Sequence, residues 1–130
     1  MTLRCVIVDD SPDVLRAASE LLEGEGVAVV GVAATGDEAV SLLEEVEPDV
    51  VLVDIVLGPE SGFELVRRLA HSVHAAACRT ILISTHDETD FADLIAESPA
   101  IGFLPKSQLS AAAIQLLLTS TRGDGRGDCE

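Results

Sequence analysis

Five short apolar runs alternate along the chain with stretches whose apolar residues recur at helical spacing, and this alternation limits the possible folds. The runs predict strands at 3–9, 27–33, 50–54, 80–84 and 101–104. Each run is almost continuously apolar, which is typical of strands in a sheet that is covered on both faces. Strict alternation of strand and helix predicts a parallel sheet with helices on both sides. We therefore expect a doubly wound (βα)5 α/β fold.

The stretches between the runs carry helix signals. Their apolar residues fall at i, i+3, i+4 and i+7 or a subset of these positions, which places them on one face of a helix. The stripes are Val14, Ala17, Ala18, Leu21 and Leu22; Ala39, Leu42, Leu43 and Val46; Phe91, Leu94 and Ile95, in a shorter fourth helix; and Leu109, Ala112, Ala113 and Leu116. Start signals agree with the stripes. Thr35 with Glu38 and Ser61 with Glu64 match the capping box, and Pro12 suits a first helical position.

Length and terminal sequence indicate a single domain. The chain has 130 residues, enough for one domain with its own core. We expect the domain to span 1–121 and the Arg-Gly-Asp-rich segment 122–130 to be a disordered tail. No apolar run approaches the roughly 20 residues of a membrane helix, and the first residues lack the features of a signal peptide. A cytoplasmic protein is therefore expected.

Charge and cysteine content exclude some classes of function. The net charge is -15, and such a surface repels nucleic acid, so direct DNA or RNA binding by this chain is not expected. Cys5, Cys78 and Cys129 are odd in number and lack the spacing of a metal site. In a reducing compartment they are expected to be free thiols.

Polar residues gather at the carboxyl ends of the expected strands. In an open parallel sheet these ends share one edge, and ligands bind there where the strand order reverses. Acidic residues end the first and third strands, hydroxyl residues end the fourth, and an amine follows the fifth. These residues are Asp9, Asp10, Asp54, Ser84, Thr85 and Lys106.

This combination favours a metal-dependent phosphate site. Several carboxylates at one edge raise at least one pKa, and a hard cation such as Mg2+ relieves the repulsion while it also contacts phosphate oxygens. Lys106 is the only lysine, whereas the other seven basic residues are Arg. A compact ammonium can act as a point charge for a phosphate, a role that a guanidinium fork does not replace. Acidic residues are also common at strand–helix loops and helix N-caps, which is the alternative for each acid taken alone.

From about Leu3 to about Thr119 the sequence resembles the response-regulator receiver domains of bacterial two-component signalling. The matching segments are Val-Asp-Asp-Ser at 8–11, Val-Asp-Ile at 53–55, Ser-Gly at 61–62, Ile-Ser-Thr at 83–85 and Gly-Phe-Leu-Pro-Lys at 102–106. The resemblance implies the flavodoxin-like strand order 2-1-3-4-5. It also implies a regulatory domain, not an enzyme, that receives a phosphoryl group from a histidine kinase or a histidine phosphotransfer protein.

The resemblance further implies the role of each site residue. Asp54 would be the phosphoacceptor. Mg2+ would be bound by Asp10, Asp54 and the backbone carbonyl of Val56, and by Asp9 through water. Ser84, Thr85 and Lys106 would bind the phosphate, and Phe103 would change position with it. The signal would then leave through the fourth helix, the fifth strand and the fifth helix, towards a downstream protein or an output domain outside this sequence.

By the same resemblance, three residues beside the site are expected to set the lifetime of the phosphate. Val56 and His86 lie two positions after Asp54 and Ser84, on the path of the hydrolytic water, and Thr85 stands where Ala is common. Val56 cannot orient a water by hydrogen bonding. We therefore expect slow self-dephosphorylation.

Two other functions on the same architecture compete with this interpretation. Phosphatases with an aspartate nucleophile use Asp-x-Asp after the first strand, whereas here the nucleophile candidate ends the third strand and the second acid is missing. Small flavin or nucleotide binders need a hydroxyl- or glycine-rich phosphate loop after the first strand, and this chain has acids there. A receiver that acts only as a binding surface is a third alternative, which the intact set of site residues disfavours.

Overall fold

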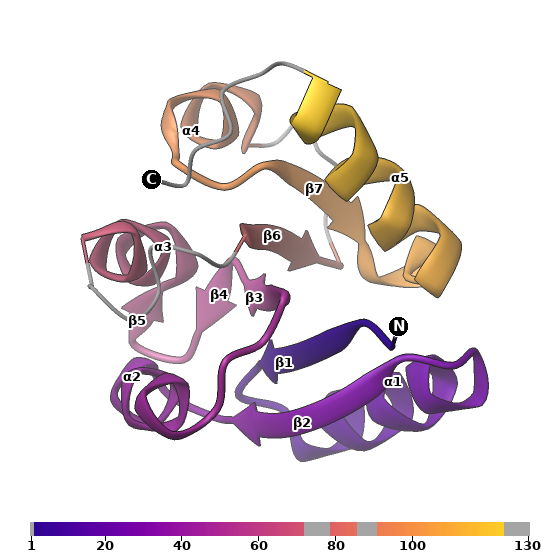
Figure 1. Cartoon of the computed structure of the whole chain (residues 1–130). Coiled ribbons are helices and arrows are strands. Elements are labelled where there is room, and N and C mark those ends of the chain that lie inside the picture. Colours follow the sequence, from indigo (N-terminus) through magenta and orange to yellow (C-terminus); the bar gives the residue numbers. More distant parts are fainter. Residues whose placement is uncertain (1, 72–78, 86–90, 124–130) are drawn as a thin grey trace.

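Five parallel strands form the central sheet of the structure, a computed structural model that describes residues 2–71, 79–85 and 91–123 (Figure 1). The strands are β1 (Arg4–Val8), β2 (Ala28–Ala33), β3 (Val50–Asp54), β6 (Arg79–Ser84) and β7 (Gly102–Pro105). Their order is β2-β1-β3-β6-β7, and all four pairs are parallel. Because β6 and β7 are the fourth and fifth strands of this sheet, the predicted order 2-1-3-4-5 is confirmed. Each strand begins and ends within one residue of its predicted limits.

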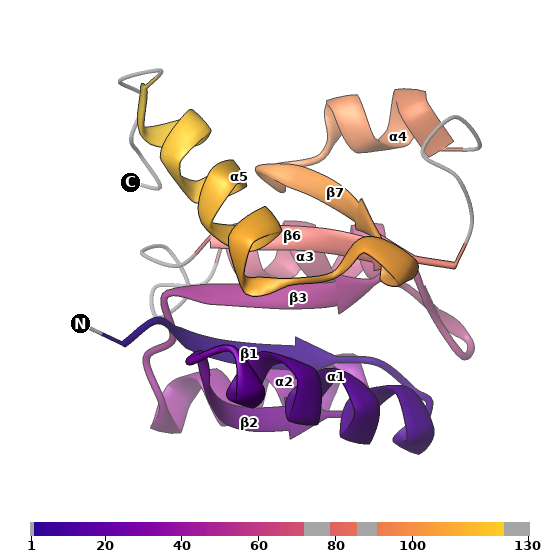
Figure 2. The same ribbon diagram turned by 90° about the vertical axis from the view of Figure 1, so that its right-hand side faces the viewer.

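Helices cover both faces of the sheet, as expected for a doubly wound fold (Figure 1, Figure 2). On one face lie α1 (Pro12–Gly24) and α5 (Ala111–Gly123); on the other lie α2 (Gly36–Glu45), α3 (Gly62–Ala70) and α4 (Ala92–Glu97). None of the helices in the described part of the chain is long and apolar enough to cross a membrane. The final helix runs two residues past the domain boundary expected at 121, and the rest of the predicted tail, 124–130, lies outside the described residues.

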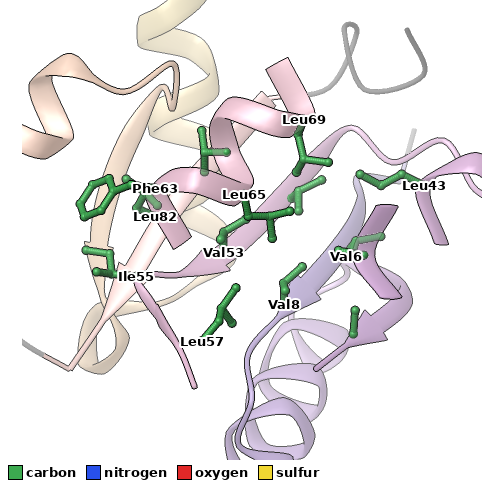
Figure 3. Packing of buried hydrophobic residues seen from close by; sticks show 14 of the residues in the cluster. Val6, Val8, Leu43, Val53, Ile55, Leu57, Phe63, Leu65, Leu69 and Leu82 are labelled. Carbon is green, nitrogen blue, oxygen red and sulfur yellow. The ribbon is translucent and has the colours of Figure 1, made fainter. Parts of the chain in front are cut away.

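The two faces of the sheet bury separate apolar clusters. Alternate residues of β1 and β3 point to opposite faces, so that Val6 and Val53 join the cluster under α2 and α3, whereas Ile7 and Leu52 join the cluster under α1 and α5. Figure 3 shows the first cluster, in which Val6, Val8 and Val53 meet helix residues such as Leu65. Every residue of β3 is buried. The carboxyl ends of β1 and β3 are therefore fixed by side-chain packing on both faces of the sheet.

Local interactions at the helix termini agree only partly with the predicted caps. Pro12 begins α1, as predicted. Thr35 Oγ1 accepts from the Glu38 N–H at 3.1 Å, while the Glu38 carboxylate reaches the N–H of Ala34, one residue before the cap. The second predicted box is wrong in detail, because Ser61 Oγ accepts from Phe63 rather than from Glu64.

The second and the last of the predicted stripes extend beyond their helices. Val46 is the C-cap of α2 in extended backbone. Leu109 follows a short 3-10 helix, η2 (Lys106–Gln108), and α5 begins two residues later. Leu109 is nevertheless buried in the core beside α5, which is why it fits an apolar stripe without being helical.

A hydrogen bond connects the C-terminal end of α1 to the N-terminal end of α5. The N–H of Ala111, the first residue of α5, donates to Glu25 Oε1 at 2.7 Å, and Glu25 is the C-cap of α1. Ser110 Oγ accepts from the Ala113 N–H at 3.0 Å. The N–H groups of the first turn of α5 are thus bonded both to Ser110, directly before the helix, and to the C-cap residue of α1.

Candidate functional site

The predicted site residues gather at the carboxyl edge of the sheet. Asp9 directly follows β1, Asp54 ends β3, Ser84 ends β6, and Lys106 begins η2 directly after β7. The strands hold them in register, since Asp54 pairs with Ile83 and Ser84 pairs with Pro105. The sheet therefore brings together side chains that are as many as 97 residues apart in sequence, from Asp9 to Lys106.

Lys106 lies between two buried carboxylates. Its Nζ atom is 2.7 Å from Asp9 Oδ2 and 3.2 Å from Asp54 Oδ2. Asp9 is fully buried and Asp54 is only 5% exposed. Backbone N–H groups hold the second oxygen of each acid: Ser11 donates to Asp9 Oδ1 at 2.9 Å, and Val56 donates to Asp54 Oδ1 at 3.2 Å. Both carboxylates are thus oriented by the loops that follow their own strands.

The electrostatics of the site reflect a surplus of negative charge. Burial raises the pKa of Asp54, and the charge of Asp9 raises it further; Lys106 and the Val56 N–H offset only part of this effect. Burial lowers the pKa of Lys106, but its contacts with Asp9 and Asp54 outweigh that and leave the pKa raised. Lys106 is therefore held as a cation, and the two acids share it as a positive partner.

The acidic cluster has the composition of a site for a hard divalent cation. Carboxylate oxygens of Asp9, Asp10 and Asp54 lie within 4.8 Å of one another. Asp9 Oδ2 is buried and has no hydrogen-bond partner of good geometry among the described residues, although the Lys106 ammonium is close by. Asp10 is exposed and extends the cluster to the solvent. An all-oxygen set that combines buried and exposed carboxylates fits Mg2+, which retains some of its waters in protein sites.

A small hairpin borders the cluster, and the sequence patterns did not predict it. Directly after Asp54, the antiparallel strands β4 (Val56–Leu57) and β5 (Glu60–Ser61) form a two-stranded sheet. Gly58 turns the chain with a φ of 60°, a conformation that glycine adopts without strain. Apolar alternation cannot reveal strands of two residues. The available signals were Gly58 and Pro59 in the loop and the Ser-Gly pair at 61–62.

Gly62 fixes the start of α3 against the strand that carries Asp54. Its N–H donates to Ile55 O at 2.7 Å. A Cβ atom at this position would overlap the Asp54 carbonyl oxygen and would lie 2.8 Å from Ile55 Cα. Only glycine fits between these two pieces of backbone.

The remaining predicted residues lie around the cluster. Ser84 is 1% exposed, whereas Thr85 is exposed in the bend that follows β6. Phe103 is 9% exposed and belongs to the cluster under α2 and α3. Val56 is 51% exposed beside Asp54. His86 lies outside the described residues.

Comparison with known proteins identifies the family. Residues 5–117 match the model of the response regulator receiver domain. The chain belongs to this family. The protein PilH of Pseudomonas aeruginosa is 39% identical over 88 residues, which are 67% of this chain and 72% of PilH.

Longer regulators also match this receiver domain. The transcriptional regulatory protein LiaR of Bacillus subtilis is 24% identical, and the match covers 94% of this chain but only 57% of LiaR. Among solved structures, a two-component response regulator of the LuxR family from Aurantimonas sp. SI85-9A1 superposes with a TM-score of 0.79 at 32% identity, covering 95% of this chain and 87% of that one. A CheY-like receiver domain from Methanospirillum hungatei shares the fold with a TM-score of 0.73 at 22% identity. The receiver fold thus extends over nearly the whole described chain.

Proposed function

We propose that this receiver domain takes a phosphoryl group from the histidine of a kinase or phosphotransfer protein onto Asp54. The observation that carries the proposal is the environment of Asp54, a buried carboxylate that faces Lys106 at 3.2 Å beside two further acids. An oxygen of Asp54 attacks phosphorus, and the bond between phosphorus and the imidazole nitrogen of the donor breaks. The domain acts as a regulatory acceptor and promotes only its own phosphorylation and slow dephosphorylation.

Asp10, Asp54 and the carbonyl of Val56 would bind Mg2+, with Asp9 acting through water. The ion, when bound, supplies positive charge to the phosphoryl oxygens. Lys106 and the Val56 N–H each contact one oxygen of the Asp54 carboxylate and so fix its orientation. Burial and, after it, the charge of Asp9 raise the pKa of Asp54, and a bound cation would favour the ionised carboxylate against both effects.

Lys106, Ser84 and Thr85 would retain the phosphorylated state. The Lys106 ammonium already lies beside Asp54 and needs to move little to contact a phosphate oxygen. Ser84 ends the strand next to that of Asp54 and can donate its hydroxyl, while Thr85 is exposed directly after it. The added charge of about -1.5 to -2 favours a rearrangement of these donors.

The signal would leave through α4, β7 and α5. Phe103 lies in β7, three residues before Lys106, and is buried in the cluster against which Phe91 and Ile95 pack. A shift of Lys106 or Ser84 would therefore change how α4 packs. The recipient would be a downstream protein or an output domain of a longer regulator, in the cytoplasm, without direct nucleic-acid binding by this domain.

Phosphorylation with acetyl phosphate and Mg2+ tests the acceptor. Mass spectrometry should find one added phosphoryl group in the parent and none in Asp54→Asn. Asp93→Asn, which removes an exposed carboxylate from α4, is the matched control and should be modified like the parent. An Asp54→Asn protein that still gains the phosphoryl mass would disprove the assignment.

A further inference from the structure

Glu60, a residue outside the acidic cluster, connects the hairpin beside the cluster to α2. Its Oε1 atom accepts from the backbone N–H of Gly36, the first residue of α2, at 2.8 Å. Gly36 is buried, and a Cβ atom there would lie 2.8 Å from the same Glu60 oxygen. The carboxylate of Glu60 thus lies tightly against the start of the helix.

The first turn of α2 is a favourable place for such an acceptor. Its backbone N–H groups have no partner within the helix, and the helix dipole attracts negative charge. Thr35 accepts from one of these groups, the N–H of Glu38. Glu60 accepts from another, and it does so from a different element of the fold.

The neighbouring ion pair between α3 and α2 is weaker support for the same connection. Arg68 Nη2 lies 3.2 Å from Asp37 Oδ1, and both side chains are largely exposed. Exposed pairs of this kind contribute little to stability. Of these two links between α2 and the segment that follows Asp54, the half-buried hydrogen bond between Gly36 and Glu60 is therefore the stronger.

The hairpin that carries Glu60 is hydrogen-bonded to the acidic cluster at Val56 and lies near it at Gly58. The Val56 N–H donates to Asp54 Oδ1, and a Cβ atom at Gly58 would be 3.4 Å from Asp10 Oδ2, an ordinary van der Waals distance. Two strands of two residues are not stable alone. Leu57, which is 2% exposed, anchors one strand in the core (Figure 3), and Glu60 anchors the other.

We propose that Glu60 is a positioning residue for the metal site. By its bond to Gly36 it fixes the hairpin against α2, and so it sets how the hairpin backbone approaches Asp10 and Asp54. The inference rests on the proposed binding of Mg2+ at these acids. Glu60 itself contacts neither acid and acts through the hairpin.

Two substitutions distinguish the effect of the hydrogen bond that Glu60 accepts from the effect of its charge. Glu60→Ala removes the acceptor, and its dissociation constant for Mg2+ should rise about fivefold, the size expected for one lost hydrogen bond. Glu60→Gln keeps an acceptor oxygen and should stay within about twofold of the parent. Glu45→Ala, at the far end of α2, removes a charge that makes no hydrogen bond within the described residues, and it should bind Mg2+ like the parent. Calorimetry suits the measurement because the chain has no Trp or Tyr.

Hydrogen exchange in the metal-free protein provides an independent readout. In Glu60→Ala, the amide of Gly36 and the hairpin amides at 56–58 and 60–61 should exchange about tenfold faster, whereas Glu60→Gln should resemble the parent. Unchanged exchange and unchanged Mg2+ affinity in Glu60→Ala would overturn the inference, and so would a Glu60→Gln protein as impaired as Glu60→Ala. If the parent binds no Mg2+, the proposed metal site fails, and the link between Glu60 and metal binding fails with it. The exchange data then decide only whether Glu60 holds the hairpin.

Discussion

Gly62 lies directly against the backbone of Asp54, so that a single methyl group at position 62 would overlap the Asp54 carbonyl oxygen. Both partners are backbone, and neither can move aside as the end of a flexible side chain can. The position of the candidate acceptor thus depends on a glycine eight residues further along the chain.

Replacing this glycine should therefore destabilise the domain. Gly62→Ala is expected to lower the free energy of unfolding by about 1 to 3 kcal/mol, the usual cost of forcing an extra carbon into a packed site. Gly24→Ala is the matched control, because a Cβ atom there meets nothing within 4 Å. Gly24→Ala, at the end of α1, should be neutral or slightly stabilising. Urea denaturation measures both, and equal stabilities would refute the steric argument.

Mg2+ should stabilise the folded domain through the acidic cluster. A ligand that binds only the native state raises its stability by about 2.7 kcal/mol at a hundredfold excess over the dissociation constant. Asp10→Ala should lose most of the resulting rise in melting temperature, because Asp10 is the exposed member of the cluster. Asp13→Ala, in the first turn of α1, is the control. If Asp10→Ala responds to Mg2+ like the parent, the metal binds elsewhere.

The pKa of Asp54 makes stability depend on pH. Because the pKa is raised in the folded state above its ordinary value of 3.8, ionising Asp54 opposes folding. The cost is absent at pH values below the ordinary pKa, where Asp54 is protonated in both states. It reaches its full size at pH values above the pKa of the folded protein. Metal-free Asp54→Asn should therefore be more stable than the parent at pH 7, by about 1 kcal/mol, a common size for a single-site effect.

Asp54→Asn should lose its advantage in acid, because the Asp54 carboxyl of the parent is then protonated and as uncharged as the Asn side chain. Urea unfolding of the two proteins at pH 7 and near pH 3 measures the difference. An advantage of equal size at both pH values would show that the ionisation of Asp54 is not its cause.

Much of this arrangement follows from the sequence, because strands and buried helix faces leave periodic patterns. The runs from Val50 to Asp54 and from Thr80 to Ser84 predict both their strands and the residues at their ends. Contacts between elements leave no such pattern. The sequence marks Glu60 as one acid among 23, and nothing in its spacing indicates Gly36 as its partner.

The predicted capping box at Ser61 shows a second limit. The pattern Ser-x-x-Glu considers only the residues at the start of the helix. Here the backbone before α3 is also held by the hairpin and by the hydrogen bond that Gly62 donates to Ile55. Ser61 Oγ therefore accepts from the N–H of Phe63, and Glu64 remains exposed.

The lifetime of the phosphorylated state should depend on Val56. This side chain is 51% exposed beside Asp54 and offers no hydrogen bond to an attacking water. Val56→Asn should speed the loss of phosphate about fivefold, which corresponds to a barrier lower by about 1 kcal/mol. Val32→Asn, at an equally exposed valine of β2, should leave the rate unchanged. The decay of phosphorylated protein after donor removal is the measurement, and equal decay in Val56→Asn and the parent would exclude a role for this position.

The outer strand β2 carries an irregularity with a consequence for self-association. Between the pairs Cys5–Val29 and Val6–Gly31 the register shifts, and Val30 is the extra residue. The strand, Ala-Val-Val-Gly-Val-Ala, has no charged side chain, and an uncharged outer strand can add a strand from another molecule. A bulge disturbs the regular spacing of N–H and C=O groups and increases the local twist. The extra valine therefore disfavours continuation of the sheet into a second copy, and it protects this edge from aggregation without the lysine that many outer strands use.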